Sequence, residues 1–133
     1  MENNNTDLRA DQIEALETLI DYTPKLVKGV NTVVAELSSN RKEDTDEYLR
    51  MVIDGINWVL GIINGCLDLV SECNVAFDKE GANDKSSKFS EAYLSKEDDK
   101  VAEALGKEVL PLIDIITDVA RKTVEACKYI ESV

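Results

Sequence analysis

Apolar residues recur every three or four positions along three long stretches of the chain. This spacing is that of an amphipathic helix, and no stretch keeps the strict alternation that is typical of a strand. The pattern predicts helices at about residues 7–38, 45–77 and 95–131. Short turns between helices favour antiparallel neighbours. The sequence therefore predicts an all-α fold, an up-down-up antiparallel bundle of three long helices.

Two prolines interrupt this pattern, Pro24 in the first predicted helix and Pro111 in the last. A proline inside a helix lacks the backbone N–H, and its ring clashes with the carbonyl four residues earlier. Because the apolar spacing continues past both prolines, we expect continuous helices that are kinked there, at the same height of the bundle. The alternative is a first helix that breaks at Pro24, which would give a four-helix bundle.

The length of 133 residues fits a single helical-bundle domain that spans residues 1–133. Two segments fall outside the helical pattern. Residues 1–6 are predicted to be a disordered tail. Residues 78–94 carry many charged side chains and are predicted to be a loop, with a possible short helix around Phe89.

The second predicted helix has more apolar surface than a three-helix bundle needs to bury. Beside its main apolar stripe runs a second one, which consists of Met51, Gly55, Trp58, Ile62, Gly65 and Leu69. Tryptophan and methionine are enriched at interfaces, and an exposed apolar patch on a soluble protein usually binds something. We therefore predict that these six residues bind a partner protein or a second copy of the chain. The alternative is that the other helices, or residues 86–94, cover the stripe.

The chain carries 27 acidic and 15 basic residues, which gives a net charge of −12, and it has no histidine. An acidic surface without a basic cluster disfavours nucleic acid and anionic membranes as partners. Histidine is the commonest general base and metal ligand, and no nucleotide-binding or hydrolase motif occurs. We expect no catalytic, cofactor-binding or metal-binding residues. The absence of a signal-peptide pattern and of a long apolar run predicts a cytoplasmic location.

Three cysteines, Cys66, Cys73 and Cys127, form no metal-binding spacing. On one helix, Cys66 and Cys73 would be about 10 Å apart along the axis, too far for a disulfide. The predicted helix directions place Cys127 near the opposite end of the bundle, about 30 Å away. We therefore expect three reduced thiols and no intramolecular disulfide.

These observations favour a non-enzymatic, acidic helical-bundle protein that binds another protein as an adaptor, small chaperone or antagonist. In size, acidity and helical build such a protein is loosely similar to bacterial export and flagellar chaperones, although no motif is shared. One alternative is an acidic decoy that occupies a basic nucleic-acid-binding or toxin surface. Another is a carboxylate-based enzyme, which would need an inward cluster of acids.

Overall fold

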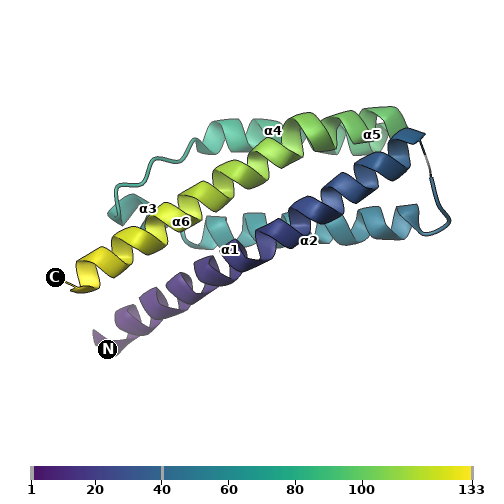
Figure 1. The fold of residues 1–133 in the computed structure, drawn as a ribbon. Coiled ribbons are helices and arrows are strands. Elements are labelled where there is room, and N and C mark those ends of the chain that lie inside the picture. The colour runs from purple at the N-terminus through teal and green to yellow at the C-terminus, as the bar shows by residue number, and fades with distance from the viewer. Residues whose placement is uncertain (1, 40, 133) are drawn as a thin grey trace.

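The computed structural model in Figure 1 describes residues 2–39 and 41–132, with side chains described for residues 8–39 and 41–128. The described residues are helical without any strand, which confirms the all-α prediction. The elements are α1 (Glu2–Ser39), α2 (Thr45–Gly65), α3 (Leu67–Glu72), α4 (Lys79–Ser95), α5 (Asp98–Ala104), the π-helical turn η1 (Leu105–Val109) and α6 (Leu110–Ser132).

Helix α1 continues through Pro24. The proline cannot donate to the carbonyl of Ile20, four residues earlier. The hydroxyl of Thr23 donates to that carbonyl instead, at 3.2 Å, so the part-buried acceptor is satisfied. The helix begins at Glu2 and so includes residues 2–6, which the sequence predicted as a disordered tail; Met1 lies outside the described residues. No glycine or proline occurs before residue 24 to end the helix.

The prediction of one helix over residues 45–77 is wrong beyond Gly65, where α2 ends. Asn64 and Gly65 are both poor helix formers, so the chain interrupts the helix there at low cost. The short helix α3 follows and ends before Asn74, which has a left-handed backbone (φ 57°). The N–H of Val75 then bonds back to the carbonyl of Val70 at 3.1 Å, a common helix-ending motif.

The prediction of a loop with a possible short helix over residues 78–94 gives too little helix, because most of this segment belongs to the 17-residue helix α4. Asp78 caps the helix, since its carboxylate accepts a hydrogen bond from the backbone N–H of Gly81 at 2.9 Å. Ala82 and Phe89, two turns apart, are both buried. The cap and these few buried side chains stabilise a helix that the apolar pattern of this charged segment does not predict.

Because α4 runs along the bundle, the last helix has the opposite direction to the one predicted. Figure 1 shows the chain entering and leaving at the same end. Lys128, near the end of α6, lies 3.6 Å from Glu17 in the first half of α1, and Arg41, which follows α1, pairs with Asp98 at the start of α5 at 2.8 Å. Helices α1 and α6 are therefore antiparallel, whereas the up-down-up prediction made the first and last helices parallel.

A π-helical turn, η1, ends two residues before Pro111 in the last helical stretch. There the N–H of Leu110 bonds to the carbonyl of Leu105, five residues back. Such turns often accompany helix irregularities. Pro24 and Ile113, which is two residues beyond Pro111, line the same groove of about 530 Å³ between α1 and α6. The kink expected at each proline stays a prediction.

Buried apolar side chains from α1 through α6 form one continuous core. Its largest fully buried members include Leu16, Leu19, Ile63, Leu105, Leu112, Ile113 and Ile116. The core brings the ends of α3 and α6 together, and the Sγ atoms of Cys73 and Cys127 lie 3.4 Å apart. The prediction that Cys127 lies far from the other cysteines is therefore wrong, because it followed from the wrong direction of the last helix. None of the three cysteines is in a disulfide.

Candidate partner-binding surface

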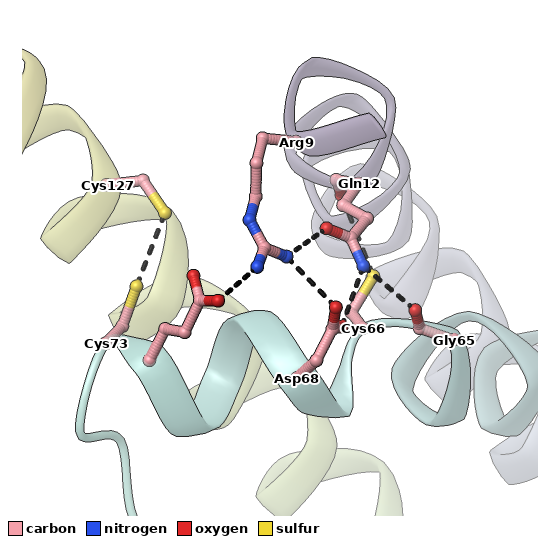
Figure 2. Close-up of polar contacts among 8 residues, drawn as sticks. Arg9, Gln12, Gly65, Cys66, Asp68, Cys73 and Cys127 are labelled. Atoms are coloured by element: carbon pink, nitrogen blue, oxygen red, sulfur yellow. Dashed lines mark hydrogen bonds and ion pairs between the residues drawn. The ribbon is translucent and has the colours of Figure 1, made fainter. Parts of the chain in front are cut away.

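A polar network fixes one end of α2 against α1 (Figure 2). The buried Gln12 amide donates to the carbonyl of Gly65 at 3.1 Å and to the carboxylate of Asp68 at 2.9 Å. Arg9 adds ion pairs to Asp68, at 3.2 Å, and to Glu72. The hydrogen bond from Gln12, with the charge of Arg9, lowers the pKa of Asp68 below its usual value. These contacts join the end of α2, and α3 after it, to α1.

Further along the same two helices, Tyr22 of α1 lies against Gly55 of α2. A methyl group added to Gly55 would meet the Tyr22 hydroxyl and come within 2.9 Å of Cδ1 of Leu26. Gly55 therefore makes room for the tyrosine. The Tyr22 ring in turn contacts Trp58 edge-on, with ring centroids 5.3 Å apart and an interplanar angle of 81°. An aromatic ring from α1 thus supports the only tryptophan of the chain.

The reverse arrangement occurs about two turns away, where Tyr48 of α2 lies over Gly29 of α1. A methyl group on Gly29 would lie 3.6 Å from the Tyr48 ring and 3.4 Å from Val52. Between the two tyrosines is a groove of about 180 Å³, lined by Tyr22, Lys25, Leu26, Gly29, Tyr48, Met51 and Val52. We name the surface formed by Tyr22, Tyr48, Met51 and Trp58 the aromatic face.

The structure divides the predicted apolar stripe. Met51 and Trp58 are exposed, with 64% and 40% of their surface accessible. The other four members differ in their exposure. Gly55 and Leu69 are buried, Ile62 is half-buried against the core, and Gly65 is exposed with its carbonyl bonded to Gln12.

The prediction of an accessible site at Gly55 and Leu69 is therefore wrong, for two separate reasons. Tyr22 occupies the space over Gly55. Leu69 belongs to α3, and the break after Gly65 turns it into the core. The glycine suggested that a second copy could approach closely at Gly55. Tyr22 of the same chain fills that space instead.

The helical pattern does not single out Tyr22 and Tyr48, which the structure adds to the site. Both are half-buried and pack against the core. Each faces a glycine on the other helix, and the register of α1 against α2 decides this pairing. A search for tyrosine and glycine at the same spacing in both helices would have found them, because Tyr22 and Tyr48 each precede a glycine by seven residues.

A second exposed apolar area lies on α4, close to the start of α2. Leu94 is 76% exposed, and it lines a groove of about 360 Å³ with Tyr93, Leu49 and Val101. The rim of this groove carries Arg41, which pairs with Asp46 and Asp98. The Arg41 contact lowers the pKa of Asp46. Leu94 therefore provides an exposed apolar side chain that does not line the groove between Tyr22 and Tyr48.

Within the described part of the chain, no group of three or more Cys, Asp or Glu side chains is placed to hold a metal ion. The same residues contain no helix that is both long and apolar enough to cross a membrane.

The comparisons with known proteins identify a family without assigning an activity. Neither a protein of curated function nor a solved structure matches the chain. One family model matches residues 14–119, which include α2, α3, α4 and the aromatic face. Since this match covers most of the 133 residues, the chain belongs to the family described as a domain of unknown function, DUF8042.

Proposed function

We propose that this protein is a non-enzymatic helical-bundle protein that binds a partner protein through the aromatic face. The observation that carries the proposal is the exposure of Met51 and Trp58 beside the groove between Tyr22 and Tyr48. Tryptophan, tyrosine and methionine are enriched at interface centres. The edge contact with Tyr22 holds Trp58 in place before binding, which lowers the entropy cost of ordering it in a complex.

The chemistry of the face indicates the kind of partner. The groove accommodates one or two apolar side chains, and an amphipathic helix is the simplest segment that presents them in a row. The net charge of −12 attracts basic proteins and increases their rate of association. We therefore propose a partner segment with apolar side chains on one face and lysine or arginine around them.

The charge pattern supports this proposal over an acidic decoy. Four lysines, at 88, 100, 107 and 122, each pair with an acid about one helical turn away. A decoy for a nucleic-acid-binding surface would present rows of unpaired acids at phosphate-like spacing. Interleaved charges are instead typical of solvated helix surfaces.

Affinity capture from a lysate of the native organism tests the proposal when matched variants are compared. The proteins to compare are the wild type, Trp58→Ala and Leu94→Ala. Each variant removes one exposed apolar side chain. We expect a partner that the wild type and Leu94→Ala retain and Trp58→Ala loses, by a factor of about 30 or more in affinity for a central aromatic anchor. Equal binding by all three proteins, or equal loss in both variants, would contradict the proposal.

The fluorescence of Trp58 reports the same event directly, because the chain has no other tryptophan. A basic partner that covers the aromatic face should shift the emission to shorter wavelength. Sedimentation of the isolated protein adds a control for self-association. A dimer that Trp58→Ala dissociates would identify the partner as a second copy of the chain.

A further inference from the structure

Two thiols from distant parts of the sequence meet at one end of the bundle (Figure 2). Cys73 directly follows α3, and Cys127 lies near the end of α6. Their Sγ atoms are 3.4 Å apart, although 54 positions separate them in the sequence. Cys73 is half-buried, whereas Cys127 is only 7% exposed.

We propose that Cys73 and Cys127 are a thiol–disulfide modification site, which a small-molecule disulfide such as oxidised glutathione converts to an intramolecular disulfide. Bond formation needs the two sulfur atoms to approach from 3.4 Å to about 2.0 Å. The chain between α3 and α4 is not helical at residues 73–78. This segment can therefore adjust by the required amount without unwinding a long helix.

The reaction proceeds by two exchanges. The Cys73 thiolate, as the more accessible one, attacks one sulfur of oxidised glutathione, forms a mixed disulfide and releases one glutathione thiolate. The Cys127 thiolate then attacks the Cys73 sulfur and releases the second glutathione. Two protein thiols are oxidised, one glutathione disulfide is reduced, and the two protons of the cysteines end on the two glutathione thiols.

Cys66 provides an internal control for this assignment. Its side chain is buried, and its thiol donates to the carbonyl of Gln12 at 3.8 Å. Burial raises its pKa, so the reactive thiolate is scarce. Cys66 should therefore remain reduced under conditions that oxidise the other two.

The disulfide should measurably stabilise the fold. It would close a long loop that contains α4, α5 and most of α6, and it would join α3 to α6. Restricting an unfolded chain of that loop length raises Tm by about 10 °C in a protein of this size, provided that the bond is unstrained.

Oxidation of the full chain by oxidised glutathione, followed by peptide mapping under non-reducing conditions, tests the proposal. We expect a Cys73–Cys127 cross-linked peptide in the wild type and in Cys66→Ser, and a Tm that rises by about 10 °C and returns after reduction. Cys127→Ser should instead accumulate glutathione on Cys73. Three results would overturn the assignment. They are glutathione adducts on Cys73 and Cys127 of the wild type without a cross-link, a cross-link to Cys66, and an unchanged Tm.

Discussion

At Gly55, helix propensity and side-chain packing predict opposite effects of a Gly→Ala substitution on stability. On an exposed helix surface, Gly→Ala stabilises because alanine restricts the unfolded chain and favours the helix. At Gly55 the new methyl would instead meet Tyr22 and approach Leu26 to 2.9 Å. The same change at Gly61, later in α2, meets no atom within 4 Å. Gly61→Ala is therefore the matched control.

The size of the effect follows from three contributions. Helix propensity favours Gly55→Ala by about 1 kcal/mol. Overpacking at Tyr22 and Leu26 costs about 1–3 kcal/mol, and displacement of the Tyr22 ring loses its contact with Trp58, which contributes about 1 kcal/mol. We expect Gly55→Ala to lower the free energy of unfolding by about 2 kcal/mol. Gly61→Ala should raise it by about 0.5–1 kcal/mol.

Urea denaturation followed by circular dichroism measures both free energies, and the emission of Trp58 shows whether its environment changes in the folded state. In a Tyr22→Ala background the cost of Gly55→Ala should largely disappear, because the obstructing ring is absent. If Gly55→Ala is as stable as Gly61→Ala, Tyr22 moves aside without cost. In that case it does not hold the tryptophan, and the proposed preorganisation of the aromatic face fails.

Three other perturbations test the rest of the structure. Thr23→Val leaves the part-buried Ile20 carbonyl without its donor and should cost about 1–2 kcal/mol in denaturant unfolding; Thr18→Val, at an exposed site, should cost less, and equal costs would contradict the role of Thr23 beside the proline. The folded-state pKa of Asp68 is lowered, so its ionised form contributes stability above the unfolded pKa of about 4 that is lost as the pH falls through the folded value. Asp68→Asn should thus lower Tm at pH 7, with a difference from the wild type that shrinks towards pH 3; a constant difference would show that the charge is not responsible. Finally, Tm should rise between low and moderate NaCl, because salt screens the repulsion of a net charge of −12; a flat or falling curve would mean that the ion pairs already balance it.

Local periodicity was sufficient to predict the parts of the fold that depend on one helix at a time. The stretches of α1, of α2 up to Gly65 and of α5 to α6 all carry wide apolar faces at helical spacing. Even the passage of α1 through Pro24 was visible, because the apolar spacing does not change phase there. The hydroxyl of Thr23 explains how the helix tolerates the proline. The end of α2 at Gly65 was harder to predict, since apolar residues continue beyond it.

The features that depend on contacts between helices could not be read from the pattern. Helix α4 buries little apolar surface, chiefly Ala82 and Phe89, and it is held by its cap and its neighbours. Treating it as a loop reversed the direction of the last helix. That single error moved Cys127 from 3.4 Å to about 30 Å from Cys73 in the prediction. The thiol pair therefore became visible only with the complete topology.

The apolar stripe of α2 could likewise be predicted only in part. The sequence shows that this helix has more apolar surface than the core can bury, because that is a property of one helix. Which part stays exposed depends on the register of α1, which Gln12 and Tyr22 help to determine. Tyr22 buries Gly55 and supports Trp58 with the same ring, so the contact that removes one residue from the surface positions another on it. The stability of the bundle and the orientation of its tryptophan are thereby coupled at one tyrosine.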